Sequence, residues 1–410
     1  MWELIRANKR NSIVLMVLMA AVLMLLGFII GLAFFGQEGG FFGLIIATAI
    51  WIVLTIISLS SGDQILLATS KAVPVTHEDH PQLFNVVEEM KIAAGLPAMP
   101  KVYIIADPAP NAFATGRNPE SASVAVTAGL LARLNRDELQ GVIAHEISHI
   151  LNRDILFVTL AGIMLGSIVL LSQVFLRGMF YSSMMGSRRR YSSGGKGGGQ
   201  AQLVMLIVAI VAAILAPIMA YLLYFALSRN REYLADAGAA RLTRYPEGLA
   251  GALEKIAGDP SPQLTTVNKV TAPMYIVNPF KKKKQLKLSD LTSTHPPISE
   301  RIKILRNMTQ GASLREYSDA FTNVTHKKSV VPVAALSKKE DVALRQASAE
   351  ADKKERTERQ MRQVGDIMRK VNQFIFLTCV CGLKLKIPPN FKGNNVKCPR
   401  CSNILDLPRK

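Results

Sequence analysis

The sequence is short of charged residues, of acidic residues and of cysteine, and each shortage excludes a class of protein. Charged residues make up only 19% of the 410-residue chain and its mean hydropathy is +0.23. These values are too apolar for a disordered chain and high for a soluble enzyme. Four cysteines in a chain of this length exclude a disulfide scaffold. Acidic residues number 30 against 49 lysines and arginines, so the chain is apolar on average and yet strongly basic.

The apolar residues are concentrated in four uncharged runs. Each run reaches the ~20 residues that a membrane-spanning helix needs, whereas a buried helix of a soluble protein is usually shorter. The first run is too long for the apolar core of a signal peptide, and a second run follows it at once. The predicted membrane spans are Ile13–Phe35, Phe41–Ser60, Ile155–Leu176 and Leu203–Leu227.

The charges next to these spans predict their orientation. Three basic side chains precede the first span, namely Arg6, Lys9 and Arg10, while the connection 36–40 carries only Glu38. The positive-inside rule therefore places the N-terminus in the cytoplasm, and two hairpins return the chain to that side. The basic loop 177–202 opposes this orientation. The C-terminal part from residue 228 on, with 34 basic and 17 acidic residues, supports it.

The segment His145-Glu146-Ile147-Ser148-His149 has H-E-x-x-H spacing. Positions i and i+4 share one face of a helix, so the two histidines can bind one Zn²⁺. Glu146 lies beside them, where it can take a proton from a water that the metal activates. Asn135 as N-cap, with Glu138 three residues later, predicts the start of this helix. The alternative is a site whose metal is absent or structural, and a structural site needs a fourth protein ligand.

A third metal ligand is expected just after the fourth apolar run. Glu232 and Asp236 lie on one face of a helix there, and Glu232 comes five residues after the run. His149 comes six residues before the third run. If the third and fourth spans form a hairpin, the two groups stand about 9 and 7.5 Å from one membrane face, since a helix rises 1.5 Å per residue. Taken alone, Glu232 would be a solvated acid near the start of a helix.

The order of these features resembles a known family, the HtpX-type membrane metalloproteases, which are gluzincins related to the CAAX prenyl proteases. The resemblance covers about residues 1–325 and includes two further segments, Asn111–Gly116 and Thr294–Pro297, the second followed by Arg301. By position, the resemblance implies zinc ligands at His145, His149 and Glu232, with Glu146 as the general base. It also implies that Asp236 orients an imidazole and that His295 assists near the oxyanion.

The resemblance further implies a substrate and a location. Members of the family cleave damaged or misassembled membrane proteins from the cytoplasmic side, so we expect a multi-pass protease of the bacterial inner membrane, with membrane or misfolded proteins as substrates. The backbone of Asn111, Ala112, Phe113 and Ala114 would hold the substrate as an added strand. Without the resemblance, this proline-flanked segment would be interpreted as an ordinary turn.

The cysteines form a second motif near the C-terminus. Cys379, Cys381, Cys398 and Cys401 give a C-x-C…C-x-x-C pattern, and four thiolates satisfy a tetrahedral structural Zn²⁺. Apolar residues alternate with lysines over 383–387, which predicts a strand. The segment resembles a zinc ribbon with a shortened first pair. A redox dithiol or a disulfide pair is the alternative, which a reducing cytoplasm disfavours. Docking of a protein is favoured over nucleic-acid binding, because aromatic side chains for base stacking are few.

Together these patterns predict a mainly α membrane protein with four transmembrane helices, a cytoplasmic gluzincin-type α+β metalloprotease domain and a small β zinc ribbon. The predicted cofactors are one catalytic and one structural zinc ion. A catalytically silent membrane adaptor with an active ribbon is the alternative function, and such a protein would be expected to lack Glu146 or a ligand. The predicted divisions are a transmembrane hairpin at 1–60, the first protease part at 61–154, a second hairpin at 155–227, the second protease part at 228–330, a charged linker or helix at 331–372 and the ribbon at 373–410.

Overall fold

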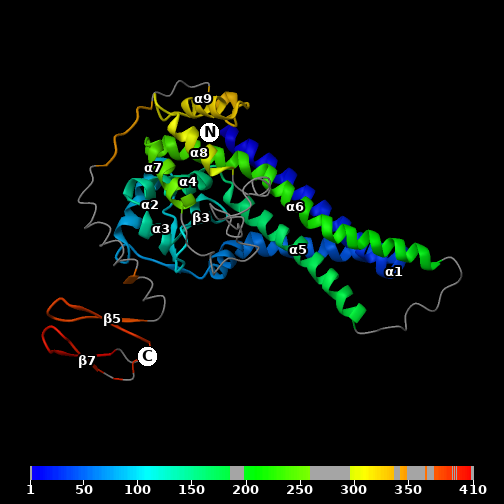
Figure 1. Ribbon diagram of the computed structural model, residues 1–410, viewed down its shortest axis with the longest axis horizontal. Helices are drawn as coiled ribbons and strands as arrows, with labels where there is room; N and C mark the ends of the chain where they lie inside the picture. Colours follow the sequence, from blue (N-terminus) through cyan, green and yellow to red (C-terminus); the bar gives the residue numbers. More distant parts are fainter. Residues whose placement is uncertain are drawn as a thin grey trace.

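The computed structural model describes residues 2–184, 198–258, 296–336, 342–348, 365–366, 374–389, 391, 393 and 395–407, and most of them are helical (Figure 1). The helices are α1 (Trp2–Thr69), α2 (Pro81–Ala94), α3 (Ala128–Arg133), α4 (Arg136–Leu151), α5 (Ile155–Met184), α6 (Gly198–Thr243), α7 (Pro246–Gly258), α8 (Ile298–Arg306), α9 (Leu314–Thr325), α10 (Val333–Leu336) and the short 3₁₀ helix η1 (Pro119–Ser121). The strands are β1 (Ala72–Pro74), β2 (Lys101–Ile105), β3 (Ala112–Thr115), β4 (Ser123–Thr127), β5 (Ile375–Thr378), β6 (Lys384–Ile387), β7 (Asn395–Lys397) and β8 (Ile404–Asp406).

Three of the described helices are long and apolar enough to cross a membrane, with stretches at Ile13–Thr69, Leu160–Tyr181 and Val204–Leu223. The first of them, α1, loses helical geometry at Gly36, where φ is 70° and where the connection 36–40 was predicted to begin. The two arms of α1 then touch. An ideal Cβ on Gly31 would lie 2.1 Å from the carbonyl oxygen of Gly39, so a side chain there would separate the arms. The first two predicted spans therefore form a helical hairpin.

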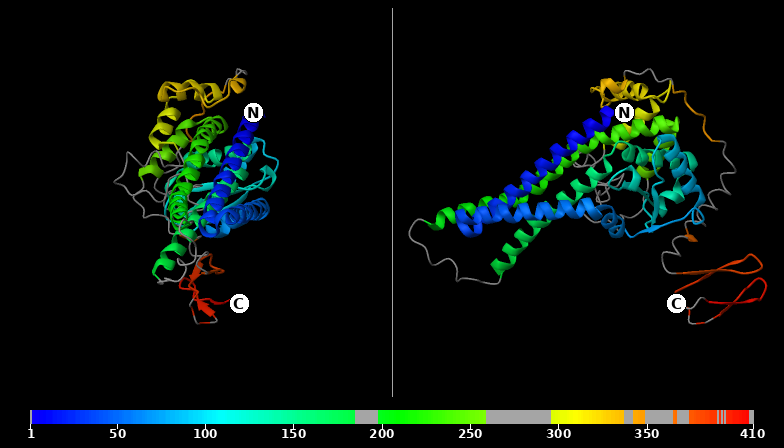
Figure 2. Two further views of the ribbon diagram at one scale, coloured as in Figure 1. Left: turned by 90° about the vertical axis from the view of Figure 1, so that its right-hand side faces the viewer. Right: turned by 180° about the vertical axis from the view of Figure 1, so that it is seen from behind.

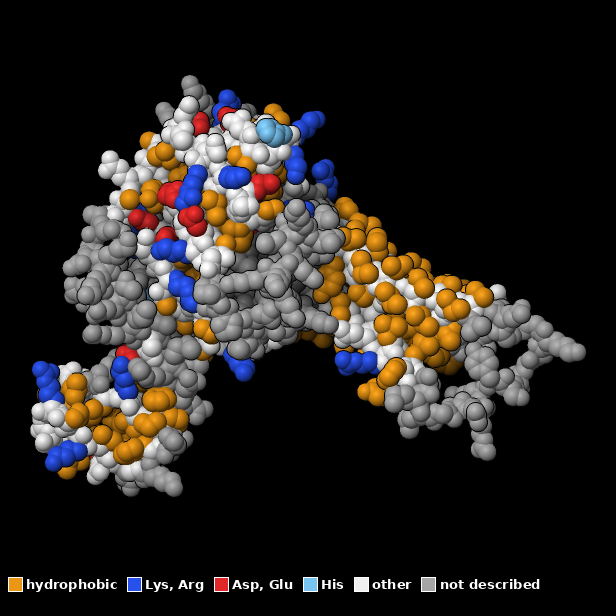
Figure 3. Space-filling view, viewed as in Figure 1, with side chains coloured by type: hydrophobic (Ala, Val, Ile, Leu, Met, Phe, Trp, Pro, Cys, Tyr) orange, Lys and Arg blue, Asp and Glu red, His pale blue; other side chains and the backbone are white. Residues whose placement is uncertain are grey.

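The long helices α1, α5 and α6 pack together and project to one side of the rest of the molecule (Figure 2). Their contact surfaces bury apolar side chains such as Leu15, Leu23, Met164, Ile168 and Ala213. Their outer surfaces are apolar as well, with exposed Phe35, Ile56, Leu170 and Ile214 among others. Figure 3 shows hydrophobic side chains over most of the described surface of these helices. An apolar exterior of this extent is characteristic of helices that face lipid.

The remaining part of the chain up to α10, together with the polar C-terminal part of α6, is called the body, and it contains a four-stranded sheet with strand order β1-β2-β4-β3. Strands β2 and β4 are parallel, with Lys101 opposite Ser123 and Ile105 opposite Thr127. Strands β1 and β3 pair antiparallel with β2 and β4 respectively. Strand β3 lies at the edge of the sheet, with no second strand partner among the described residues.

Helix α4 lies in the middle of the body, in contact with α2, α6, α7 and β3. Its apolar residues Val142, Ile143, Ile147 and Ile150 are fully buried. They belong to one core that includes Leu249 of α7 and Tyr317 of α9. Because α4 is held on several sides by this core, the polar side chains that it carries have fixed positions.

Two helices connect the body directly to the apolar bundle. Helix α5 begins at Ile155, immediately after the turn that ends α4. Helix α6 runs without interruption through 46 residues, from its apolar stretch Val204–Leu223 to the buried Glu232 and Asp236. The residues of α4 and of α6 therefore meet close to the end of the bundle, as the hairpin argument required.

The C-terminal part contains two small antiparallel hairpins, β5–β6 and β7–β8, which we call the four-cysteine module (residues 374–407 as far as they are described). Strand β6 is the strand that the alternating residues 383–387 predicted. Between the body and this module, residues 342–348 lie against the body. Part of the segment predicted as a charged linker, 331–372, is thus packed on the protease side of the molecule.

Candidate active site and metal centres

The H-E-x-x-H helix begins where the sequence predicted. Asn135 Oδ1 accepts a hydrogen bond from Glu138 N at 2.8 Å, and Glu138 Oε2 accepts one from Asn135 N at 2.8 Å, which completes a capping box. Helix α6 can approach α4 closely because residue 238 is glycine: an ideal Cβ there would lie 2.5 Å from Ser148 Oγ. These two features bring the histidine face of α4 against α6.

His145 and His149 from α4 meet Glu232 from α6 in one cluster. The two Nε2 atoms are 3.2 Å apart, and the Glu232 carboxylate oxygens lie 3.5 Å from His145 Nε2 and 3.6 Å from His149 Nε2. A tetrahedral zinc ion with bonds of about 2.0–2.1 Å to nitrogen and oxygen separates its ligand atoms by about 3.3 Å. The three side chains therefore have the spacing that one zinc ion requires.

The other ring nitrogens face carboxylates. His145 Nδ1 lies 3.0 Å from Asp236 Oδ1, and His149 Nδ1 lies 3.1 and 3.2 Å from the two oxygens of Asp154. A ring nitrogen that faces a carboxylate carries the proton, which leaves a lone pair on each Nε2. Two lone pairs and the Glu232 carboxylate then point at one place, where they repel each other unless a cation lies between them. The donor set fits zinc.

The buried charges around the cluster also favour a bound cation. Four buried carboxylates lie in or next to the cluster, namely Glu146, Asp154, Glu232 and Asp236, and the buried guanidinium of Arg301 pairs with the last two. Burial lowers the pKa of both histidines, but the carboxylates outweigh it: Asp236 and Glu232 raise the pKa of His145, and Asp154 raises the pKa of His149 to about 10. The site thus favours added positive charge, which protons supply when no metal is bound.

Arg301 of α8 fixes the carboxylate that faces His145. Its Nε and Nη2 donate hydrogen bonds to the two oxygens of Asp236 at 2.8 and 2.6 Å, and Nη1 lies 3.6 Å from Glu232 Oε2. Burial opposes ionisation of Asp236, but the Arg301 charge outweighs it and lowers the pKa of that carboxyl group. Arg301 is itself only 1% exposed, so the pair is shielded from water.

Glu146 lies between the histidines and strand β3. It is 4% exposed, and burial raises the pKa of its carboxyl group, while a hydrogen bond from the backbone of Ala114 opposes that shift. Just before β3, Asn111 O accepts a hydrogen bond from Thr127 N. By the alternation of antiparallel pairs, Ala112 and Ala114 direct their backbone N–H and C=O groups away from β4. The outer edge of β3 therefore lies next to Glu146.

The structure brings most of the predicted site residues together. His145, Glu146, His149, Glu232 and Asp236 are neighbours. The segment Asn111, Ala112, Phe113 and Ala114 forms the edge strand and the residue before it, rather than the alternative turn. His295 lies outside the described residues.

Two contacts were not predicted from the sequence: that of Asp154 with His149, and that of Arg301 with Asp236. Asp154 was not selected, although an acid five residues after the second histidine is a signal that could have found it. Arg301 was noted only as part of a motif, and nothing in the sequence indicated its contact with Asp236, which lies 65 residues earlier. Both residues act by holding the imidazoles or their partners in place.

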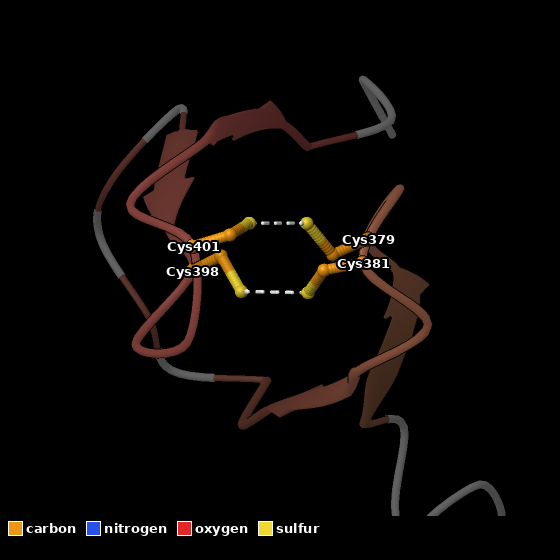
Figure 4. Close-up of side chains that lie close together, drawn as sticks. All are labelled: Cys379, Cys381, Cys398 and Cys401. Carbon is orange, nitrogen blue, oxygen red and sulfur yellow. Dashed lines mark hydrogen bonds between the residues drawn. The ribbon is translucent and has the colours of Figure 1, made fainter.

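The four cysteines form a separate cluster, shown in Figure 4. Cys379 Sγ lies 3.3 Å from Cys401 Sγ, and Cys381 Sγ lies 3.6 Å from Cys398 Sγ, so the cysteines are not joined as disulfides. All four sulfur atoms lie within 4.8 Å of one another, close enough to share one metal ion. Desolvation opposes ionisation of Cys398, but backbone N–H groups of Cys401 and Arg400 outweigh it and lower its pKa to about 6. A thiolate is the form that binds zinc.

Comparison with known proteins identifies relatives of the protease part. The profile of peptidase family M48 matches residues 77–309. The Protease HtpX homolog of Dictyoglomus thermophilum is 47% identical over 307 residues, which are 75% of this chain and 94% of that protein. The Protease HtpX homolog of Listeria monocytogenes is 44% identical over 309 residues, 75% of this chain and 100% of that protein. A crystal structure of S. mikatae Ste24p is 19% identical and covers 74% of this chain and 67% of that chain, with a TM-score of 0.39. A quarter of this chain therefore has no counterpart in the HtpX homologs named.

Proposed function

This chain belongs to peptidase family M48 and is a membrane zinc protease, and we propose that it cleaves membrane or misfolded proteins at the cytoplasmic face of a bacterial inner membrane, with Glu146 as the general base. The observation that carries the proposal is the cluster of His145, His149 and Glu232 at zinc-ligand spacing, with Glu146 buried beside it. A silent adaptor is less well supported, because a chain without activity has no need of both the ligand set and the adjacent acid.

The proposed ligands are His145, His149 and Glu232. Zinc held by them would act as a Lewis acid. It would polarise a carbonyl group and lower the pKa of a bound water to about 7. The chain's own residues then handle the protons. The carboxylate of Glu146 accepts a proton from the attacking water and passes that proton to the leaving amine. Burial raises the pKa of the Glu146 carboxyl group, which makes its carboxylate a stronger proton acceptor for this exchange.

Substrate binding is proposed at the outer edge of β3. The backbone C=O of Ala112 faces that edge, where an extended peptide can pair as an added strand, while the Ala112 N–H donates to Asn111 Oδ1 at 2.8 Å. Glu146 lies next to the same edge, so a peptide paired with β3 would present its backbone close to the proposed zinc ligands. A peptide must be locally unfolded to pair in this way, which favours misfolded or loosely folded substrates.

The orientation in the membrane is also proposed. The two arms of α1, together with α5 and α6, would make four crossings. The N-terminus lies at the body end of the long helices (Figures 1 and 2), and the basic residues before the first span favour the cytoplasm. Both observations support a body that faces the cytoplasm. The basic loop that opposes this orientation falls mostly in residues 185–197, outside the described part of the chain.

The remaining roles are assigned in the same way. Asp236 is proposed to orient His145, and Asp154 to orient His149, because each lies at hydrogen-bonding distance from the nitrogen opposite the proposed metal ligand. His295 is proposed as a donor to the oxyanion on the basis of its motif alone. Cys379, Cys381, Cys398 and Cys401 are proposed to hold a second, structural zinc ion that makes the four-cysteine module a zinc ribbon.

The direct test is Glu146→Gln in the full chain, purified in detergent. We expect cleavage of a loosely folded membrane protein to fall by about 10²–10⁴-fold, since a positioned base contributes this much, while zinc content measured by metal analysis stays unchanged. Glu120→Gln, a change at an exposed glutamate of η1, is the matched control and should retain activity. Full activity of Glu146→Gln would sink the assignment of the base.

A further inference from the structure

Residues 342–348, which we call the docked segment, lie beyond the family profile and yet bind the protease body at several points. At one end, Ala312 N donates a hydrogen bond to Val342 O at 2.8 Å. In the middle, Arg345 N donates one to Arg244 O at 2.7 Å. At the other end, Ser348 N donates one to Asp137 Oδ2 at 2.9 Å. The segment thus bridges the start of α4, the turn after α6 and the turn before α9.

Arg345 is the anchor of the segment, and it contacts a set of partners that we call the arginine socket: Asp137, Gln140, Thr243 and Tyr245. Its Nη2 donates to Asp137 Oδ1 at 3.1 Å and to Gln140 Oε1 at 2.9 Å, and its Nε donates to Thr243 O at 3.3 Å. Its guanidinium carbon lies 5.1 Å from the centre of the Tyr245 ring. A planar cation with fixed donors fits this set, whereas a lysine ammonium would not match it.

Ser348 completes the arrangement. Its Oγ donates to Asp137 Oδ1 at 2.6 Å and accepts a hydrogen bond from Arg345 Nη1 at 3.1 Å. Both oxygens of Asp137 are therefore occupied by the docked segment. Asp137 lies in the first turn of α4, the helix that carries His145, Glu146 and His149. The carboxylate also suits that position electrostatically, because the N-terminus of a helix favours negative charge.

We propose that the arginine socket is a peptide-binding site for an Arg-x-x-Ser segment, and that its occupant is residues 342–348 of the same chain. The docked segment then attaches the C-terminal part of the chain to the start of α4, the helix that carries His145, Glu146 and His149. The aligned part of the Dictyoglomus and Listeria relatives covers only three quarters of this chain, so this attachment belongs to chains that carry such a C-terminal part.

Binding of the docked segment to the body shortens the connection between the body and the four-cysteine module. About 37 residues separate the end of α10 from the first described residue of the module, and about 25 separate Ser348 from it. At no more than about 3.5 Å per residue, the greatest reach falls from about 130 Å to about 90 Å. A partner bound to the module is thereby confined to a smaller volume around the body and its proposed active site.

The test is hydrogen–deuterium exchange on the full chain in detergent, followed by mass spectrometry of peptides that cover 342–348. We expect these amides to exchange at least about tenfold more slowly than a free chain, because hydrogen bonds to charged groups hold the segment on the body. Arg345→Ala should bring exchange to the free-chain rate. Arg345→Lys should recover little of the protection, while Gln346→Ala, at an exposed position of the same segment, should retain it.

Two results would overturn the proposal. One is exchange in the unmodified chain at the free-chain rate, or equal protection in Arg345→Ala. The other is protection that falls on dilution, because this would assign the occupant to a second copy of the chain. Asp137→Asn provides an independent check from the socket side and should lose protection as Arg345→Ala does. None of these readouts depends on proteolysis, so they stand apart from the test of Glu146.

Discussion

The two candidate metal centres are built in opposite ways. The His145, His149 and Glu232 cluster takes its side chains from two helices, α4 and α6, with more than 80 residues between the histidines and the glutamate. Buried charged groups and a large apolar core surround these side chains. The four-cysteine module takes all of its ligands from two turns within 23 residues and has few buried side chains, among them Cys379, Ile387 and Cys398. The fold of the body positions the first site, whereas a metal bound at the second site must help to fold the four-cysteine module.

This difference implies different consequences of losing the metal. The body holds its ligands with the capping box of α4, the contact at Gly238 and the Arg301–Asp236 pair, none of which requires zinc. Segments of fewer than about 40 residues seldom fold without a metal or disulfides. We therefore expect the body to stay folded without metal and the four-cysteine module to unfold.

The largest expected effect follows from Cys398→Ser or from a zinc chelator. Structural zinc in small modules contributes about 10–16 kcal/mol of binding free energy, so β5–β8 should lose all protection from hydrogen exchange. His149→Ala should remove zinc from the body and leave protection of α4 and of the module in place. Persistent protection of β5–β8 without metal would break the comparison.

The next effect concerns the buried ion pairs that make the body independent of metal. Arg301→Met leaves Asp236 and Glu232 buried without their cation, which should cost about 3–5 kcal/mol in the free energy of unfolding. Arg306→Met is the matched control on the same helix: its partners Glu247 and Glu254 are exposed, so stability should change little. Denaturant unfolding of the two variants measures the difference, and equal values would contradict it.

A smaller effect is expected for Asp154→Asn. The amide keeps the shape of the side chain but no longer favours the protonated Nδ1 of His149, so zinc affinity of the body site should fall about 10–100-fold. Competition with a chelator, monitored by zinc release, measures the change. Asp319→Asn, an exposed change on α9, is the control. An unchanged affinity would mean that the fold alone orients the ring.

The smallest effect concerns the segment that links the two centres. Burial opposes ionisation of Asp137, but the Ser348 and Arg345 hydrogen bonds outweigh it and lower the pKa of Asp137. Stability from a carboxyl group with a lowered pKa is present above its ordinary value of about 3.9 and is lost as pH falls through the folded-state value. Exchange protection of 342–348, corrected for intrinsic rates, should be constant from neutral pH to about pH 5 and decrease below about pH 4. Protection that is constant throughout this range would contradict the role of Asp137.

Local patterns were predictable from the sequence, and partners across the fold were not. The capping box of α4, strand β6 and the two cysteine pairs each depend on spacings of a few residues, so the sequence revealed them. The hairpin in α1 followed from the length of its apolar runs. The contact of Asp154 with His149, the Arg301–Asp236 pair and the socket for Arg345 depend on which elements pack together. Arg345 in particular lies in a charged segment whose composition resembles that of a solvated linker.

The continuity of α6 links the site to its lipid surroundings. Glu232 stands nine residues beyond the apolar stretch that ends at Leu223, or about 13 Å along the helix axis. A tilt of α6 by about ten degrees about that point would displace the Glu232 carboxylate by about 2 Å relative to the histidines of α4. Helices respond to bilayer thickness by tilting. The thickness of the membrane would thereby act on the position of Glu232, the proposed third zinc ligand.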